Sequence, residues 1–260
     1  MNDTITSTSN ERMKRIRALS MKKNRDEEKV FVVEGAEHIK KALENGWQVE
    51  TLLYTAAAKN SAGRIISTAE SQNSFIYEVN DKVASYVTDR DNPQNVIGVL
   101  KQQYHTIDSV NQGLWLGLEN IRDPGNLGTI IRTADAVGVE GIILLGITCD
   151  AFSPEVIRAT TGSFSAIPLI KLLVPEFISW RKNFTGSVIG THLYEKSVNY
   201  REVKLTPPSI LLMGSEQDGL SAGLTSACDV LAKIPMREGV ESLNLAISTA
   251  LMLYELKCSA

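Results

Sequence analysis

The chain has 260 residues, of which 43% are hydrophobic and 22% are charged, with a formal net charge of −3 and a pI of about 5.7. These proportions are ordinary for a soluble globular protein, the length accommodates two domains, and no apolar run is long enough to cross a bilayer. The acidic balance argues against a protein that binds nucleic acid over its whole surface.

The cysteines and the first residues indicate a compartment. Cys149, Cys228 and Cys258 are widely spaced and odd in number, so the sequence predicts neither a disulfide framework nor a zinc motif. The opening residues, MNDTITSTSN, lack the apolar core of a secretory signal. We therefore expect a cytoplasmic protein without a metal site.

Basic residues crowd one early segment, which is predicted as a helix with Met13, Ile16 and Leu19 turned inward. Such a cluster can neutralise phosphates. The alternative is the ordinary solvated face of an amphipathic helix, and the segment alone leaves both interpretations open. The candidate RNA-binding residues of this segment are Lys14, Arg15, Lys22, Lys23 and Arg25.

Strand and helix patterns alternate through the rest of the first half. Strands are expected at 30–33, 49–54, 75–79 and 96–100, and helices at 34–45, 62–69 and 81–87. Such alternation predicts βαβ units around a largely parallel sheet. The polar stretch 101–112 interrupts the rhythm, so we expect one domain over residues 1–106 and a second over 113–260.

The second half repeats the alternation, which predicts an α/β fold there as well. Strands are expected at 114–118, 141–145, 168–172, 187–192, 210–213 and 230–234. Helices are expected at 129–137, 154–161, 176–183, 220–227 and 242–256. The last helix is apolar on nearly every side, which predicts burial in a large core or against another subunit.

Three polar loops follow strands in this half, at 120–132, 213–220 and 234–245. Open α/β sheets bind ligands at the carboxyl ends of their strands, and glycines there let the backbone approach a ligand. Each polar residue of these loops has a simpler explanation as a cap, a turn residue or an ion-pair partner, but their joint occurrence favours a site. The set is Asn126, Arg132, Glu216, Ser242 and Asn244, in which the arginine suits a phosphodiester.

Other kinds of site lack the required spacing. Gly125 and Gly128 are too close together for a dinucleotide fingerprint, and the chain has no phosphate loop and no nucleophile elbow. His38, His105 and His192 have neither metal-ligand nor triad spacing, so we expect them to be surface or packing residues.

Three segments resemble, in order, the three motifs of the SpoU (TrmH-like) family of RNA ribose 2′-O-methyltransferases, within the SPOUT superfamily. They are NIRDPGNLGTIIRTADAVG, LLMGSEQDGLS and IPMREGVESLNLA, and the likeness runs from Leu114 to the C-terminus through SPEVIRATTGSF at 153–164. The first half resembles, less specifically, an L30e-like substrate-binding domain, mainly through KNRDEEKVFVVEG at 23–35.

This resemblance implies a fold and a function. The C-terminal domain would be an α/β domain closed by a trefoil knot whose loops bind S-adenosylmethionine, and catalytic domains would pair into a homodimer with composite active sites. The acceptor would be RNA, with 23S ribosomal RNA expected and transfer RNA as the alternative. The resemblance does not identify the target nucleotide. It also leaves open whether the methylation serves a housekeeping role or confers antibiotic resistance.

The family's functional positions carry over to this chain residue by residue. Asn126, Arg132, Glu216, Ser242 and Asn244 match its catalytic positions, and Glu238 stands where glycine is common in the third motif, which leaves its effect open. The matches to the methyl-donor pocket are Gly214, Ile234, Met236, Leu243 and Leu245.

For Arg132 we expect a grip on the phosphate next to the target and stabilisation of the developing alkoxide, and whether it also removes the proton stays open. Three rival functions remain. They are a non-catalytic RNA-binding scaffold, a methyltransferase that acts on a base, and, more distantly, a Rossmann oxidoreductase.

Overall fold

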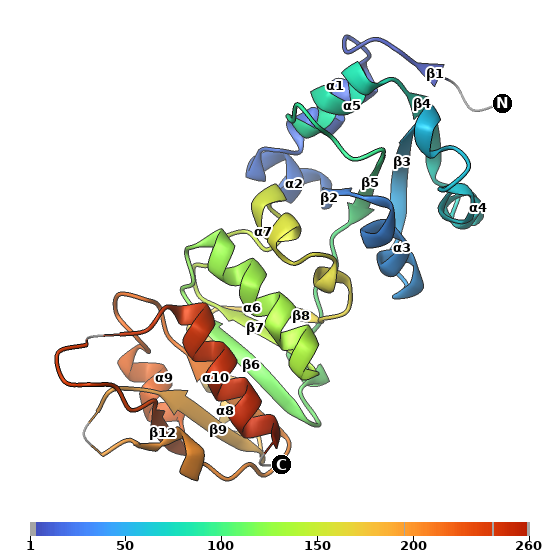
Figure 1. Cartoon of the computed structure of the whole chain (residues 1–260). Helices are drawn as coiled ribbons and strands as arrows, with labels where there is room; N and C mark the ends of the chain where they lie inside the picture. The colour runs from blue at the N-terminus through green and yellow to red at the C-terminus, as the bar shows by residue number, and fades with distance from the viewer. Residues whose placement is uncertain (1–3, 195, 241, 259–260) are drawn as a thin grey trace. The chain divides into compact units, whose positions relative to one another are not determined.

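A computed structural model describes residues 4–194, 196–240 and 242–258 (Figure 1). The chain divides into two compact units. The first contains the described residues up to Gln102 together with Asp150–Ala166, and the second contains Gln103–Cys149 and the described residues from Ile167 onward. The inclusion of 150–166 in the first unit was not expected from the sequence. The predicted domain limits remain a prediction, because a unit defined by packing need not be a unit of function.

The first unit is built on a mixed sheet in the strand order β1-β4-β3-β5-β2. β4 pairs in parallel with β1 and β3, whereas β5 runs antiparallel to β3 and β2. The expectation of a largely parallel sheet is therefore wrong for this half. A buried apolar run is compatible with both parallel and antiparallel pairing, so the sequence pattern does not predict the direction of a strand in the sheet. The strands are β1 (Thr4–Ile5), β2 (Val30–Glu34), β3 (Val49–Thr55), β4 (Phe75–Val79) and β5 (Val96–Lys101).

The helices of this unit lie close to their predicted positions, except that the basic segment forms two short helices rather than one. Met13, Ile16 and Leu19 are buried in the core of the unit, as predicted. The first of the two helices packs against α5. The helices are α1 (Glu11–Ala18), α2 (Lys22–Glu28), α3 (Ala36–Glu44), α4 (Gly63–Ser71) and α5 (Asp81–Thr88).

The segment 150–166 belongs to the core of the first unit. It contains α7 (Pro154–Ala159), which starts after Ser153 as predicted, because that hydroxyl accepts a hydrogen bond from the backbone of Val156. Phe152 packs against Phe31 with ring centroids 4.6 Å apart, and the indole N–H of Trp47 donates to the carbonyl of Ser165 at 3.0 Å. Aromatic contacts of this kind need partners that are distant in the sequence, so no local pattern predicts them.

The second unit is an α/β layer structure around a parallel sheet in the order β10-β12-β9-β11-β6-β7-β8. The α/β class is confirmed. Because all strands are parallel, their carboxyl ends meet at one edge. The strands are β6 (Leu114–Glu119), β7 (Gly141–Leu145), β8 (Leu169–Leu172), β9 (Ser187–Thr191), β10 (Val198–Asn199), β11 (Ser209–Met213) and β12 (Val230–Lys233).

Helices cover both faces of this sheet (Figure 1). α8 (Val174–Arg181) and α9 (Ala222–Ala227) lie on one face, where Phe177 and Leu224 join a core cluster with Ile210 and Leu212 of β11. α6 (Pro124–Val137) and α10 (Leu245–Cys258) pack side by side on the other face. Within the described ranges, no helix is long and apolar enough to cross a membrane.

Candidate functional site

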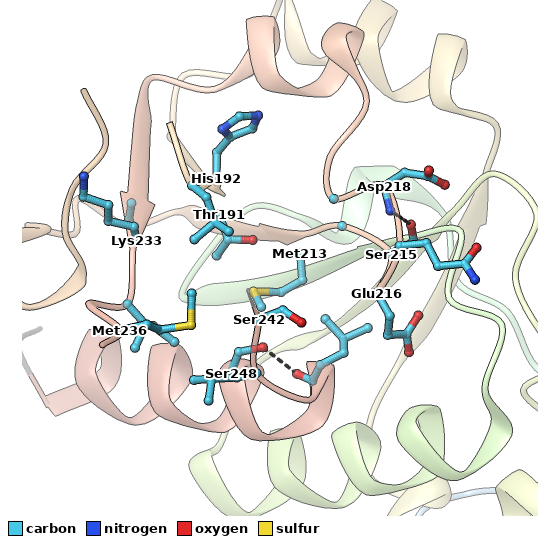
Figure 2. Close-up of a pocket in the computed structure, with 18 residues that line it drawn as sticks. Thr191, His192, Met213, Ser215, Glu216, Asp218, Lys233, Met236, Ser242 and Ser248 are labelled. Atoms are coloured by element: carbon cyan, nitrogen blue, oxygen red, sulfur yellow. Dashed lines mark hydrogen bonds between the residues drawn. The ribbon is translucent and has the colours of Figure 1, made fainter. Parts of the chain in front are cut away.

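A cavity of about 400 Å³ lies at the carboxyl ends of β9, β11 and β12 (Figure 2). Its walls come from the strand ends and from the second and third polar loops. All five residues predicted for a methyl-donor pocket line it, as do the predicted Glu216 and Ser242. The five are Gly214, Ile234, Met236, Leu243 and Leu245.

The second loop closes tightly at one end of the cavity. The backbones of Ser215 and Gly219 exchange hydrogen bonds of 3.2 and 3.1 Å, and the hydroxyl of Ser215 accepts from the backbone N–H of Asp218 at 3.1 Å. A Cβ on Gly214 would lie 2.0 Å from the carbonyl carbon of Gly219, so a side chain has no room there. This loop therefore presents backbone, not side chain, to the cavity at Gly214.

A buried carboxylate, not predicted from the sequence, anchors the far end of the same loop. Glu119 ends β6, is only 3% exposed, and its Oε2 accepts from the backbone N–H of Ser221 at 2.7 Å. This bond ties the second loop to the strand that leads into the first loop. The sequence places Glu119 directly after a predicted buried strand, which could have indicated this role. A glutamate at such a position is also compatible with an exposed surface residue, so the sequence alone does not decide.

The three polar loops are joined by hydrogen bonds between side chains. The side-chain amide of Asn126 donates to Glu216 Oε1 at 2.7 Å, and the amide of Asn244 donates to Asn126 Oδ1 at 3.0 Å. Because a carboxylate only accepts, these bonds fix which way the Asn126 amide points. Three of the five predicted catalytic residues therefore form one connected chain beside the cavity.

The first residues of two helices position the hydrogen-bonded residues Asn126 and Asn244. Both helices begin at other residues than predicted. α6 begins at Pro124 rather than at 129, because Asp123 caps it by accepting from the backbone N–H of Asn126 at 2.6 Å. α10 begins at Leu245, and its cap is Asn244, whose Oδ1 accepts from the backbone of Ala246 at 2.9 Å. Ser242, where the sequence predicted the start of this helix, lies before it and lines the cavity.

Arg132 stands apart from the cavity within one chain. It is exposed on α6, it is not a lining residue, and it makes no hydrogen bond or ion pair with any residue that the structure describes. The simple alternative for this residue, an ion pair with Glu119, Asp123 or Asp135, is therefore not formed. Its guanidinium is free to meet a ligand or a second chain.

His192 is a lining residue that the sequence did not predict. Its Nδ1 accepts from the backbone N–H of Tyr194 at 3.0 Å, which orients the ring. In Figure 2 the carboxylates of Glu216 and Asp218 lie on the opposite side of the cavity from Lys233. The cavity thus combines apolar walls, the backbone of Gly214, and side chains of both charges.

Cys228 is not a reactive thiol, and no metal site is found among the described residues. Burial raises the pKa of the Cys228 thiol to about 12, and its Sγ contacts the carbonyl of Leu224 at 3.2 Å, so it stays protonated as a packing residue. Among the described residues, no cluster of histidine, cysteine or carboxylate side chains could hold a metal ion.

The predicted RNA-binding residues of the first unit differ in what they contact. Lys14 pairs with Glu11 at 2.7 Å, and Lys22 pairs with Asp26, all near the surface. Arg15 bonds Glu28 at 2.5 Å and Glu50 at 2.7 Å. Lys23 is exposed, with no partner among the described residues. Lys14, Arg15 and Lys22 can still reach a phosphate by exchanging a surface partner, and Lys23 can reach one directly.

Arg25 is a correction to the predicted RNA-binding set. It is 3% exposed, and its Nε and Nη2 donate to Asp150 Oδ2 at 2.9 and 2.7 Å. Its Nη1 donates to the carbonyls of Leu19 and Ser20 at 2.6 and 2.7 Å. A guanidinium with all these bonds is unavailable to RNA, so Arg25 fastens the segment 150–166 to the first unit.

Two family models match the chain. The model of the SpoU rRNA Methylase family matches residues 113–254, and the model of the MRM3-like substrate binding domain matches residues 10–98. The first match contains all the loops that build the cavity. The second covers most of the first unit.

Relatives match over nearly the whole length. The chain is 30% identical to the 23S rRNA (guanosine(2553)-2′-O)-methyltransferase RlmP of Bacillus subtilis, over 97% of this chain and 98% of that protein. It is also 30% identical to the 23S rRNA (uridine(2479)-2′-O)-methyltransferase of Streptomyces viridochromogenes, over 86% of this chain and 81% of that one.

A crystal structure of an rRNA methyltransferase from Sinorhizobium meliloti superposes with a TM-score of 0.91 at 43% identity, covering 97% of this chain and 96% of that one, and its AdoMet-bound form superposes equally well. The matched family model spans more than half of the chain and includes every loop of the cavity. The chain therefore belongs to the SpoU rRNA methylase family.

Proposed function

We propose that this chain transfers a methyl group from S-adenosylmethionine to a ribose 2′-hydroxyl of 23S ribosomal RNA. The observation that carries the proposal is the connected chain Glu216–Asn126–Asn244, which joins the three family loops beside one cavity. The 23S rRNA activity of the two relatives and the match of the first unit to a substrate binding domain support this choice of substrate.

The cavity residues fit the methyl donor. Pockets of roughly 300–1,000 Å³ with apolar walls and a few polar groups are typical of small-molecule sites. Ile234, Met236 and Leu243 offer an apolar slot for adenine, and Gly214 leaves room for close backbone contact. Glu216, Asp218 and Lys233 offer charges for the donor's ammonium and carboxylate groups.

When bound, the donor supplies a methyl carbon that is activated by its positive sulfur. The 2′-oxygen forms the new bond to this carbon as the carbon–sulfur bond breaks, the bonding pair leaves with the sulfur as S-adenosylhomocysteine, and the hydroxyl proton passes to solvent water. The protein has to align the reactants and stabilise charge on the 2′-oxygen. Arg132 supplies a fixed positive charge and a fork for the neighbouring phosphate, and it is a poor base because a guanidinium keeps its proton in proteins.

Asn126 has a positioning role in this mechanism. Its amide is held from both sides, by Glu216 and by Asn244, so it offers a neutral hydrogen-bonding group in a fixed place. Ser242 lies on the cavity wall and adds a hydroxyl that can orient donor or ribose. A preorganised polar frame of this kind loses little free energy to reorganisation during the reaction.

A homodimer completes the site in this proposal. Ile247, Leu251 and Tyr254 are 56%, 40% and 52% exposed, and their spacing places them on one face of α10 beside α6. An exposed apolar stripe of this kind marks an interaction surface. Pairing through it brings Arg132 of one protomer towards the cavity of the other. The proposal also includes the trefoil knot around the third loop and a cytoplasmic location.

The direct test is methyl transfer from labelled S-adenosylmethionine to 23S rRNA fragments, with matched fragments that carry 2′-deoxyribose at the target. Label should enter the ribose fragment only, and the Asn126→Ala variant should lose most of it. Transfer to the deoxy fragment would point to base methylation. Tight RNA binding without any transfer would point to a non-catalytic scaffold, and either outcome would refute the proposal.

A further inference from the structure

The loop that follows β6 carries a second exposed arginine that the proposed chemistry does not use. Arg122 lies between Ile121, which is fully buried, and Asp123, which caps α6. It makes no hydrogen bond or ion pair with any described residue. Most other arginines that the structure describes are bonded to carboxylates, carbonyls or rings, namely Arg12, Arg15, Arg17, Arg25, Arg90, Arg181 and Arg201.

The backbone around Arg122 is held in place by the neighbouring loop after β7. The backbone N–H of Asn120 donates to the carbonyl of Leu145 at 3.0 Å, and Asn120 Oδ1 accepts from the backbone of Ile147 at 2.9 Å. The N–H of Cys149 donates to the carbonyl of Ile121 at 2.7 Å. The two loops therefore form one ordered platform, and the Arg122 side chain on it has no hydrogen-bond or ion-pair partner among the residues that the structure describes.

The same platform presents an exposed apolar side chain. Ile147 is 82% exposed, although its own backbone is bonded to Asn120. Leu173, which is 60% exposed, follows the adjacent strand β8, and the backbone of Gly146 bonds the carbonyl of Leu172 at 3.0 Å. Apolar groups held at the surface beside a free guanidinium suit a ligand with an anionic group and a flat or apolar face.

A nucleotide of RNA has both features. Its phosphate matches the planar fork of an arginine, and its base or sugar offers a face for an aliphatic side chain. The platform lies at the carboxyl edge of the sheet that also carries the cavity, and its first loop leads directly into the helix with Asn126. RNA whose target ribose is placed at the cavity would bring its neighbouring nucleotides to this edge.

We propose that Arg122 and Ile147 form a contact site for an RNA nucleotide adjacent to the methylated one, with Arg122 on its phosphate and Ile147 against its base or sugar. This inference rests on the proposed function and assigns substrate recognition, not chemistry, to the platform. Unlike removal of Arg132, removal of Arg122 is therefore expected to weaken RNA binding without changing the rate of the bound complex.

The test compares Arg122→Gln, Arg122→Lys and Ile147→Ser with Lys182→Gln, a control that removes one exposed positive charge at the end of α8. We expect Arg122→Gln to raise KM for RNA about tenfold, as for the loss of a charged hydrogen bond, and to lower the slope of binding against salt by about one contact. Arg122→Lys should keep the salt slope but lose part of the affinity. Ile147→Ser should raise KM about threefold, since it removes a modest apolar contact.

Turnover at saturating RNA and the Kd for S-adenosylmethionine should stay unchanged in all these variants. A KM for Arg122→Gln equal to that of Lys182→Gln would overturn the assignment, as would a fall in turnover at unchanged KM. An unchanged KM for Ile147→Ser would remove that residue from the site. RNA binding measured directly keeps the test separate from the proposed function, which fails if the unmodified protein binds RNA without methylating it.

Discussion

The basic segment of the first unit and the segment that follows β6 in the second unit hold their arginines in different states. In the basic segment of the first unit, Lys14, Arg15 and Lys22 are paired with carboxylates, and Arg25 is buried in an ion pair with Asp150. In the second unit, Arg122 and Arg132 are exposed and bond no described residue. The number of cations in a stretch of sequence is therefore a poor guide to where phosphate is gripped. An unpaired guanidinium on an ordered element is a better one.

The largest expected effect comes from the free arginine beside the proposed chemistry. Arg132→Ala should lower methyl transfer about a thousandfold, because it removes the charge that stabilises the developing alkoxide. Single-turnover assays with saturating RNA measure this directly. Arg132→Lys should restore a small part of the rate, since it keeps the charge without the fork.

Donor binding is the control for this variant. Calorimetric titration should give the same Kd for S-adenosylmethionine in Arg132→Ala as in the unmodified protein, because the proposal assigns Arg132 to the phosphate of the RNA and Arg132 does not line the cavity of its own chain. Near-normal turnover in Arg132→Ala would contradict the role assigned to this residue.

The next effect contrasts a buried cation with an exposed one. Arg25→Ala should lower the free energy of unfolding by about 3–5 kcal/mol, because it leaves Asp150 charged and unpaired in the interior. Arg15→Ala breaks only surface pairs and should cost below about 1 kcal/mol. Chemical denaturation of both variants gives the comparison, and equal losses of stability would show that burial of Arg25 has no special consequence.

The smallest effect is expected from the exposed cations of the basic segment in the first unit. Replacing Lys14, Arg15, Lys22 and Lys23 together by glutamine should weaken RNA binding about tenfold and flatten its dependence on salt. Turnover of bound RNA should not change, since none of these residues lies in the unit that holds the cavity. A salt dependence identical to that of the unmodified protein would return the segment to an ordinary solvated surface.

Much of this architecture is predictable from the sequence because its signals are local. The apolar runs predicted β4 and β7 with the limits that the structure has. The Ser153–Pro154 pair correctly predicted the start of α7. Of the ten residues predicted in the three polar loops, nine line the cavity or join in the hydrogen-bonded chain beside it, and Arg132 does neither.

What the sequence did not give depends on partners distant in the chain. Burial of Arg25 needs Asp150, and the place of 150–166 in the first unit needs aromatic contacts with Phe31 and Trp47. In the sequence, His192 has no neighbour that indicates a site. It lines the cavity because β9, which it follows, lies between β11 and β12 in the sheet. Only tertiary packing decides such cases.

The central claim is that the cavity and Arg132 together deliver a methyl group to a ribose hydroxyl of 23S rRNA. The most direct measurement is a map of 2′-O-methylated positions in total RNA from cells that contain the protein, cells that lack it, and cells that carry only Arg132→Ala. We predict one or a few 23S rRNA positions that are methylated in the first and unmethylated in both others. Identical maps in all three would contradict the claim.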